Sequence, residues 1–338
     1  MDWFYNAFDA AQQWLFVQVI QPLAFWAGAG NLLEQGYGAT EWLLVGVLQI
    51  TVLVLVLGPA QRLWPVEPVT DRRAVRVDVL YTLLHRLGLF KLLMFFSFEA
   101  WALDVFGWLR VRGLPTLQID QLWPGVTDVA WVSFLLYLVL FDLVGYWLHR
   151  WQHHWHWWWQ LHAVHHSQRQ MTMWTDNRNH LLDSVITDLV FVTVALLVGV
   201  GPSQFVALVA LSQLMESLQH ANLRWPWPAW AERLVVSPRF HRHHHAIALS
   251  HEPEAALVPG RAPAAEGARA TPRAPDRFGV NYGILFPWWD MLFGSADWRG
   301  GYDATGIDDQ VLKGRDYGRG FWAQQWLGLR RLAGLARR

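Results

Sequence analysis

Cysteine is absent from this chain of 338 residues. Its absence excludes disulfide frameworks, thiolate zinc sites, iron–sulfur clusters and cysteine nucleophiles, so any bound metal has to be held by nitrogen or oxygen. Charge is also scarce, because only 16% of the residues are charged and Lys plus Arg balance Asp plus Glu at 27 each. An ordinary soluble domain is roughly 25% charged. Without net positive charge we expect no nucleic-acid partner.

Long apolar runs are abundant instead, since 53% of the residues are hydrophobic. Residues 42–60 contain no charge, and a helix of that length spans about 28 Å, close to the thickness of a bilayer core. Further apolar runs of helical length lie at residues 80–109, 129–148, 184–200 and 203–219. The sequence therefore predicts an all-α fold, an integral-membrane helical bundle.

Basic residues indicate the orientation of this bundle. Residues 1–61 contain no Lys or Arg, whereas Arg62, Arg72 and Arg73 follow the first apolar run. Short cytoplasmic loops retain such residues, so we expect residues 61–78 in the cytoplasm. Two further crossings return the chain to that side at His149.

Composition divides the chain into three parts. We expect an N-terminal membrane region at residues 1–128, a central domain at 129–298 and a C-terminal amphipathic tail at 299–338. Residues 250–277 are rich in Ala, Pro, Glu and Arg, a composition that cannot bury a core and predicts a flexible insertion. The end of the tail interleaves aromatic residues and Leu with Arg, which favours a helix on the anionic inner leaflet.

Histidines are clustered, because 13 of the 15 lie between His149 and His245. In HRWQH, His149 and His153 are four residues apart, a spacing that puts both imidazoles on one face of a helix. The segments HAVHH and HRHHH repeat this geometry with three imidazoles each, namely His162, His165, His166, His241, His244 and His245. His154, His156 and His243 are out of phase with the spacing, and we do not expect them to bind metal.

Eight spaced imidazoles exceed the capacity of one tetrahedral or octahedral ion, so the count predicts a dinuclear site. Further donors lie nearby. His220 ends the run 203–219, one turn after Glu216, and is expected as a ligand. His180 follows a polar stretch and is expected to complete the set, with Glu216 as the alternative.

Two carboxylates are spaced to support these ligands. Asp142 lies seven residues before His149, two turns back on the same helical face, and can accept the second imidazole N–H. Asp183, three residues after His180, can act in the same way.

These motifs resemble the fatty acid hydroxylase superfamily, the branch that contains sterol desaturases, sterol hydroxylases and alkylglycerol monooxygenase. The resemblance covers about residues 130–298. Its segments are DLVGYWLHRWQHH from Asp142, LHAVHHS from Leu161, the RxHxxE/D element at Arg178, HAN at His220, SPRFHRHHH from Ser237 and NYGILFPWWDMLFGS from Asn281. The family motif adds Asn281 to the residues expected around the ligands.

The resemblance implies a membrane di-iron oxygenase that hydroxylates or desaturates an unactivated C–H bond of a lipid with O2. It implies a helical cap on the cytoplasmic side that holds two Fe ions, for which Zn can substitute since imidazole binds both metals. A haem-binding cytochrome b5-like segment is not recognised, so electrons are expected from a separate ferredoxin, cytochrome or reductase.

Two alternatives stay open at this point. The same chemistry in alkylglycerol monooxygenase cleaves an ether bond with a pteridine donor. A non-catalytic metal-binding or metal-transport protein is the other, although transport would place polar ligands along a path through the bilayer.

Overall fold

The computed structural model describes residues 2–94, 98, 100–247, 249 and 279–335, and no strand is formed within them. The membrane part consists of α1 (Asp2–Leu15), α2 (Gln21–Trp26), α3 (Leu33–Val52), α4 (Gly58–Leu63), α5 (Arg72–Arg86), α6 (Leu89–Met94), α7 (Ala100–Val111), α8 (Ala130–His154), α10 (Leu181–Val198) and α11 (Pro202–His220). We call the remaining helices and their loops the cap: α9 (His156–His166), α12 (Ala229–Glu232), α13 (Pro238–His244), α14 (Trp288–Phe293), α15 (Asp308–Leu312) and α16 (Phe321–Leu332).

Among the described residues, three helical stretches are long and apolar enough to cross a membrane: Gly30–Leu63, Ala130–His154 and Leu181–Val198. They contain the predicted run 42–60 and most of the runs 129–148 and 184–200, so the prediction of an all-α membrane bundle is confirmed. The first stretch continues from α3 through a π-helical segment at Leu53–Leu57 into α4. Helix α11 packs against α3 and α8 within the same bundle.

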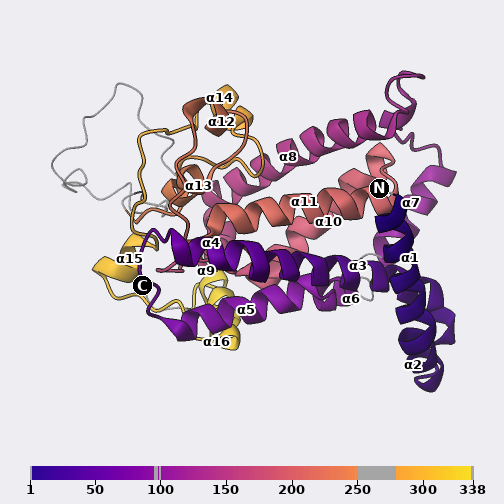
Figure 1. Cartoon of the computed structure of the whole chain (residues 1–338), viewed down its shortest axis with the longest axis horizontal. Helices are drawn as coiled ribbons and strands as arrows, with labels where there is room; N and C mark the ends of the chain where they lie inside the picture. Colours follow the sequence, from indigo (N-terminus) through magenta and orange to yellow (C-terminus); the bar gives the residue numbers. More distant parts are fainter. Residues whose placement is uncertain (1, 95–97, 99, 248, 250–278, 336–338) are drawn as a thin grey trace.

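The apolar run 80–109 is divided differently from the expectation. Its first helix, α5, begins at Arg72 because Asp71 caps it by accepting hydrogen bonds from two backbone N–H groups. The helix ends near Gly88, whose φ of +79° is easy only for glycine, and α6 follows. Helix α5 runs antiparallel beside α3 in Figure 1.

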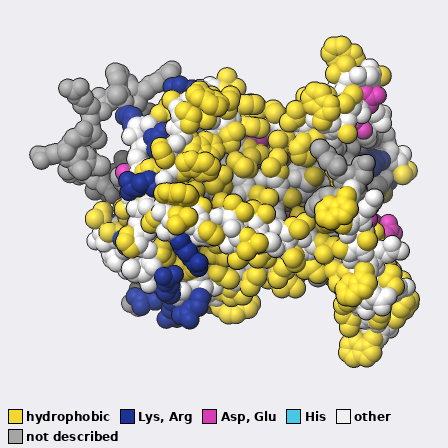
Figure 2. Space-filling view, in the orientation of Figure 1, with side chains coloured by type: hydrophobic (Ala, Val, Ile, Leu, Met, Phe, Trp, Pro, Cys, Tyr) yellow, Lys and Arg dark blue, Asp and Glu magenta, His cyan; other side chains and the backbone are white. Residues whose placement is uncertain are grey.

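Packing between α3 and α5 depends on Gly46. A Cβ atom at this position would lie 1.6 Å from the carbonyl oxygen of Arg86, so only glycine permits the approach. The outer surface is apolar, as the middle of the molecule in Figure 2 shows. Leu55, Val56 and Trp131 are exposed, as expected of side chains that face lipid.

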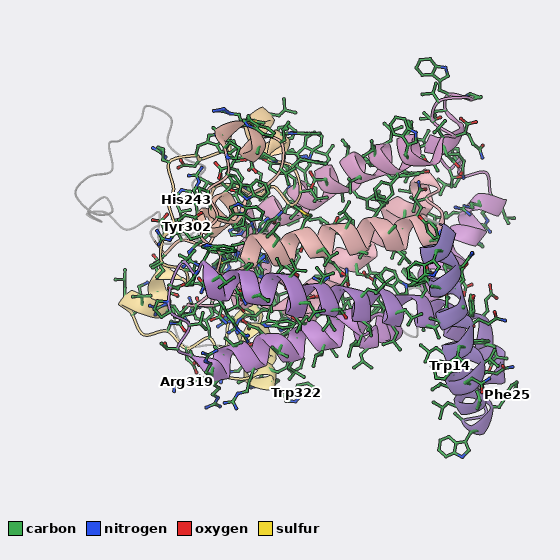
Figure 3. The ribbon with its side chains drawn as sticks, in the orientation of Figure 1. Trp14, Phe25, His243, Tyr302, Arg319 and Trp322 are labelled. Carbon is green, nitrogen blue, oxygen red and sulfur yellow. The ribbon has the colours of Figure 1, made fainter. Side chains whose placement is uncertain are left out.

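The two ends of the molecule are formed by different elements. Helices α1, α2 and α7 lie at one end in Figure 1, where Trp14 and Phe25 are labelled in Figure 3. The cap lies at the other end, together with the C-terminus of α8 and a group of Lys and Arg side chains around Arg319.

The predicted tail 299–338 is helical at α16, and α16 packs on α9 within the cap. Tyr81 of α5 joins it through hydrogen bonds with Gln324 and Gln325. The helix is amphipathic with its polar side inward, because these two glutamines are buried while Trp322 and Trp326 are exposed. The predicted flexible insertion 250–277 lies outside the described residues.

Candidate metal centre

Four helices bring nine histidines to the junction between the bundle and the cap. Helix α8 supplies His149 and His153 near its C-terminus, α9 supplies the HAVHH cluster, and α11 ends at His220. The short helix α13 begins where Ser237 accepts a hydrogen bond from the Phe240 N–H, and it positions the HRHHH cluster. All nine side chains are buried, so water has little access to their ring nitrogens.

The histidines form two adjacent groups of four. The first group is His149, His153, His162 and His166, and the second is His165, His220, His241 and His245. Within each group, one ring nitrogen from every residue lies within 4.8 Å of the others. His244 lies between the groups, close to His166 and His245.

Distances inside the second group fit ligation of a cation. The Nε2 atom of His220 lies 3.1 Å from that of His165 and 3.0 Å from that of His241, and the Nε2 atoms of His241 and His245 are 3.2 Å apart. Ligand nitrogens at about 2.1 Å from one ion and at right angles to each other are about 3.0 Å apart. The group can therefore hold a metal ion.

Protonation cannot stabilise these contacts as well as a metal would. Burial, and then repulsion between neighbouring imidazoles, lowers the pKa of His165, His241 and His245 well below the usual value for histidine. The three rings are therefore neutral at pH 7, and a neutral imidazole offers the lone pair that a metal ion needs.

Hydrogen bonds at Nδ1 orient four of the nine imidazole rings, so that Nε2 of each ring points toward the histidine groups. The acceptors are one carboxylate and three backbone carbonyls: Asp183 Oδ2 for His162 (3.2 Å), and the carbonyl oxygens of Tyr282 for His149 (2.9 Å), Glu216 for His220 (2.7 Å) and Val280 for His244 (2.7 Å). Such bonds fix the tautomer and ring orientation of metal-binding histidines.

Comparison with known proteins agrees with this geometry. The sequence profile of the family described as Fatty acid hydroxylase matches residues 134–257, a range that includes all nine clustered histidines. Residues 134–257 are a fatty acid hydroxylase domain.

A curated relative of the domain is the Delta(7)-sterol 5(6)-desaturase erg3C of Aspergillus fumigatus. It is 26% identical over 200 residues, which cover 52% of this chain and 53% of the relative. The chain therefore spans about half the length of the relative that it matches. No solved structure matches the chain.

Asp183 supports the domain's first histidine group, although it orients His162 and not the expected His180. Its Oδ1 atom also accepts hydrogen bonds from Gln152 Nε2 (2.8 Å) and Trp158 Nε1 (2.6 Å). One buried carboxylate thus joins α8, α9 and α10.

Asp142 has a different partner from the one expected, since the Nδ1 atom of His149 donates to Tyr282. The Asp142 carboxylate accepts from the backbone N–H groups of Leu285 (2.6 Å) and Phe286 (3.2 Å) and from Trp289 Nε1 (2.8 Å). It therefore anchors the loop that carries the Tyr282 carbonyl and orients His149 indirectly.

Asn281 also acts on this loop. Its backbone has φ +60°, a left-handed conformation that Asn tolerates. Its side-chain amide donates to the carbonyl oxygens of Phe240 (3.1 Å) and Asp297 (2.9 Å) and accepts from the Asp297 N–H (2.6 Å). The bond to Phe240 ties the loop to α13 directly before His241.

His180 lies outside both histidine groups. Its Nε2 atom donates to the Gln325 carbonyl oxygen (2.8 Å), and its Nδ1 atom accepts from the Leu182 N–H (3.1 Å). Both ring nitrogens are thus used, and His180 caps α10 and joins it to α16. Glu216, the alternative, lines a cavity beside the histidines and is not part of either group.

His243 is likewise outside the groups, as expected from its phase. It binds Asp303 through Nδ1 (3.1 Å); burial alone would lower its pKa, but the bonds to Asp297 and Asp303 raise it. His154 and His156 are exposed.

Two buried ion pairs support the site and were not predicted. Arg178 binds Asp78 (2.6 Å) and donates to the Val164 carbonyl of α9 (3.2 Å). Arg86 binds Asp176 (2.6 Å). The signal in the sequence was the presence of Asp78 and Arg86 in an otherwise apolar stretch, where a buried charge needs a partner.

A cavity of about 280 Å³ extends from the histidines into the bundle. His149, His162 and His220 form its inner end, and Trp42 and Phe205 belong to its wall in the membrane part. Its volume is near the lower end of the range for small-molecule sites. The cavity thus connects the two histidine groups with a space between the membrane helices.

Proposed function

We propose that this protein is a membrane-bound di-iron oxygenase that hydroxylates or desaturates an unactivated C–H bond of a lipid. The observation that carries the proposal is the pair of adjacent, buried histidine groups at the inner end of a cavity that reaches the membrane part. The family of the domain and its desaturase relative support the same chemistry.

The two groups assign the ligands. One ion would be held by His149, His153, His162 and His166, and the other by His165, His220, His241 and His245, with His244 next to both. His180 is no longer part of the proposed set because both its nitrogens are hydrogen-bonded. Imidazole suits iron, zinc and copper; iron follows from the family, and zinc can substitute without redox activity.

Bound iron supplies the O2-dependent redox chemistry that removes hydrogen from an unactivated C–H bond, which amino-acid side chains cannot do. The chain contributes the rest. Asp183 and the carbonyls of Tyr282, Val280 and Glu216 hold the imidazoles in one orientation, and burial of the ligands excludes bulk water. The cavity admits a lipid from the bilayer.

Hydroxylation of R–H to R–OH with O2 also forms one water and consumes two electrons and two protons. Desaturation consumes the same external electrons and forms two waters. We propose that a separate ferredoxin, cytochrome or reductase supplies these electrons.

We propose that the cap lies on the cytoplasmic side of the membrane. The supporting observation is that α4 ends, just after Arg62, and α5 begins, at Arg72, at the same end of the bundle as the cap, and short cytoplasmic loops are enriched in basic residues. We further propose the three predicted parts, 1–128, 129–298 and 299–338, as the domain organisation.

The proposal is tested with purified protein in lipid nanodiscs, loaded with Fe(II) and supplied with a reductant and a lipid extract. We expect O2 uptake and a lipid product that has gained one oxygen or lost two hydrogens. His165→Ala should abolish both, and the matched variant His156→Ala, outside the groups, should not. Metal binding without O2 uptake would instead favour a non-catalytic metal-binding protein, and uptake only with a reduced pterin would favour ether cleavage.

A further inference from the structure

The residues of the cavity wall change from polar to apolar with distance from the histidines. On α11, Gln219 lines the cavity next to His220. Glu216 and Gln213, two further polar residues, follow along the helix, and Val209 and Phe205 lie beyond them. Because a helix rises 1.5 Å per residue, the two polar residues lie about 6 and 10 Å along the axis from His220, and Phe205 about 22 Å.

Helix α10 shows the same order. Ser184, Thr187 and Asp188 line the cavity and are followed by Phe191, which stacks on Phe141 (ring centroids 5.8 Å apart). Polar side chains thus lie between the metal groups and the apolar outer part of the cavity. We call Lys91, Asp188, Gln213 and Glu216 the polar band.

The band contains an ion pair inside the membrane bundle. Lys91 of α6 binds Asp188 of α10, which belongs to the candidate span Leu181–Val198. Both side chains line the cavity and retain 15 to 16% exposure. The Oδ2 atom of Asp188 has no hydrogen-bond partner among the described residues, so it is available to a hydrogen-bond donor.

Helix packing alone does not account for this pair. Apolar residues would join α6 to α10 without the cost of removing two charges from water, a cost that often exceeds the gain from the ion pair. Ionisable residues within membrane segments commonly mark a functional path or site. The carboxyl group of Glu216 faces the same cavity one turn from His220.

We propose that the polar band selects lipids that carry a hydroxyl group. The hydroxyl donates to Asp188 or Glu216 and accepts from Lys91, while the hydrocarbon remainder lies among Phe191, Phe205 and the other apolar residues of the outer wall. The oxidised carbon then belongs to the hydroxyl-bearing part of the molecule and not to the far end of its hydrocarbon. This inference rests on the proposed function for turnover, but not for binding.

Binding is tested without oxygen chemistry, on zinc-loaded full-length protein in nanodiscs. Equal amounts of an alcohol and its hydrocarbon compete, and mass spectrometry measures which one is retained. One pair is cholesterol and cholestane, and the other is octadecan-1-ol and octadecane, so that the two pairs distinguish a polycyclic from a linear lipid. We expect at least one pair to favour the alcohol by about tenfold or more, the size of a hydrogen bond to a charged group.

The double variant Lys91→Met/Asp188→Leu removes both charges together, so neither is left unpaired. We expect its alcohol-to-hydrocarbon ratio to fall to about one while retention of the hydrocarbon persists. Leu197→Ala, on the exposed side of α10 and outside the cavity wall, is the control and should leave the ratio unchanged. If the double variant fails to retain zinc, Lys91→Gln/Asp188→Asn replaces it; its amides keep neutral hydrogen bonds, so the ratio should fall clearly below that of the wild type but stay above one.

Two results would overturn the inference: a ratio near one in the wild type for both pairs, or an unchanged ratio in the double variants. Neither result touches the oxygenase proposal, which O2 uptake tests. Conversely, discrimination that persists in a protein without O2 uptake would reject the oxygenase and keep the binding site.

Discussion

Replacement of Asp183 by Asn perturbs one histidine group at a single point. The carboxylate accepts hydrogen bonds from His162, Gln152 and Trp158. Asparagine keeps the volume but offers one oxygen, so at least one of the three donors loses its acceptor. The His162 bond is the longest of the three, at 3.2 Å, and we expect it to be lost first.

The expected effect on metal binding is large and local. Loss of a hydrogen bond that orients a metal-binding histidine typically lowers affinity by about 10- to 100-fold. Asp183→Asn should therefore weaken one of two sites, so that a metal titration separates into a tight and a weak step. The second group should keep its affinity, because its bonds do not involve Asp183.

The assay is titration of the metal-free protein with Fe(II) or Zn(II), with bound metal counted by mass spectrometry. Asp303→Asn is the control, because Asp303 binds His243, outside both groups. Unchanged affinity in Asp183→Asn, or equal weakening of both sites, would refute the assignment of Asp183 to the first group.

Three further predictions follow from the same contacts. His165→Ala should lower bound iron to about half or less and abolish activity, while His156→Ala retains both, as metal analysis with a turnover assay will show. The metal-free protein should lose stability as pH falls through about 6.5, because burial lowers the pKa of His165, His241 and His245 and the unfolded chain binds more protons there; a thermal melting temperature that stays constant between pH 8 and 5.5 would contradict this. Gly46→Ala should destabilise the bundle by about 1–3 kcal/mol or more by overpacking against α5, whereas Gly38→Ala, with open space around its Cβ, should not; thermal unfolding in detergent compares the two.

The periodicity of the sequence predicted most of the fold and most of the candidate metal-binding histidines. Apolar runs of helical length marked the spans, and the spacing of His149 and His153 placed both rings on one face of α8. Local spacing suffices for these features because each is a property of one helix.

The orienting contacts could not be predicted in this way. The carbonyl acceptors of Tyr282 and Val280 lie in a loop whose path depends on Asn281 and Asp142, and no periodicity encodes that path. His180 resembled a ligand by residue type, but the Gln325 carbonyl of α16 and the Leu182 N–H of α10 are the partners of its nitrogens. Tertiary contacts between distant segments decided both cases.

The central claim is that the nine histidines hold two iron ions in each chain. Quantitative metal analysis of the purified protein after expression with iron, with ⁵⁷Fe Mössbauer spectroscopy on the same sample, tests it most directly. We expect two iron ions per chain with the spectrum of a coupled pair. One ion per chain, or isolated uncoupled iron, would contradict it.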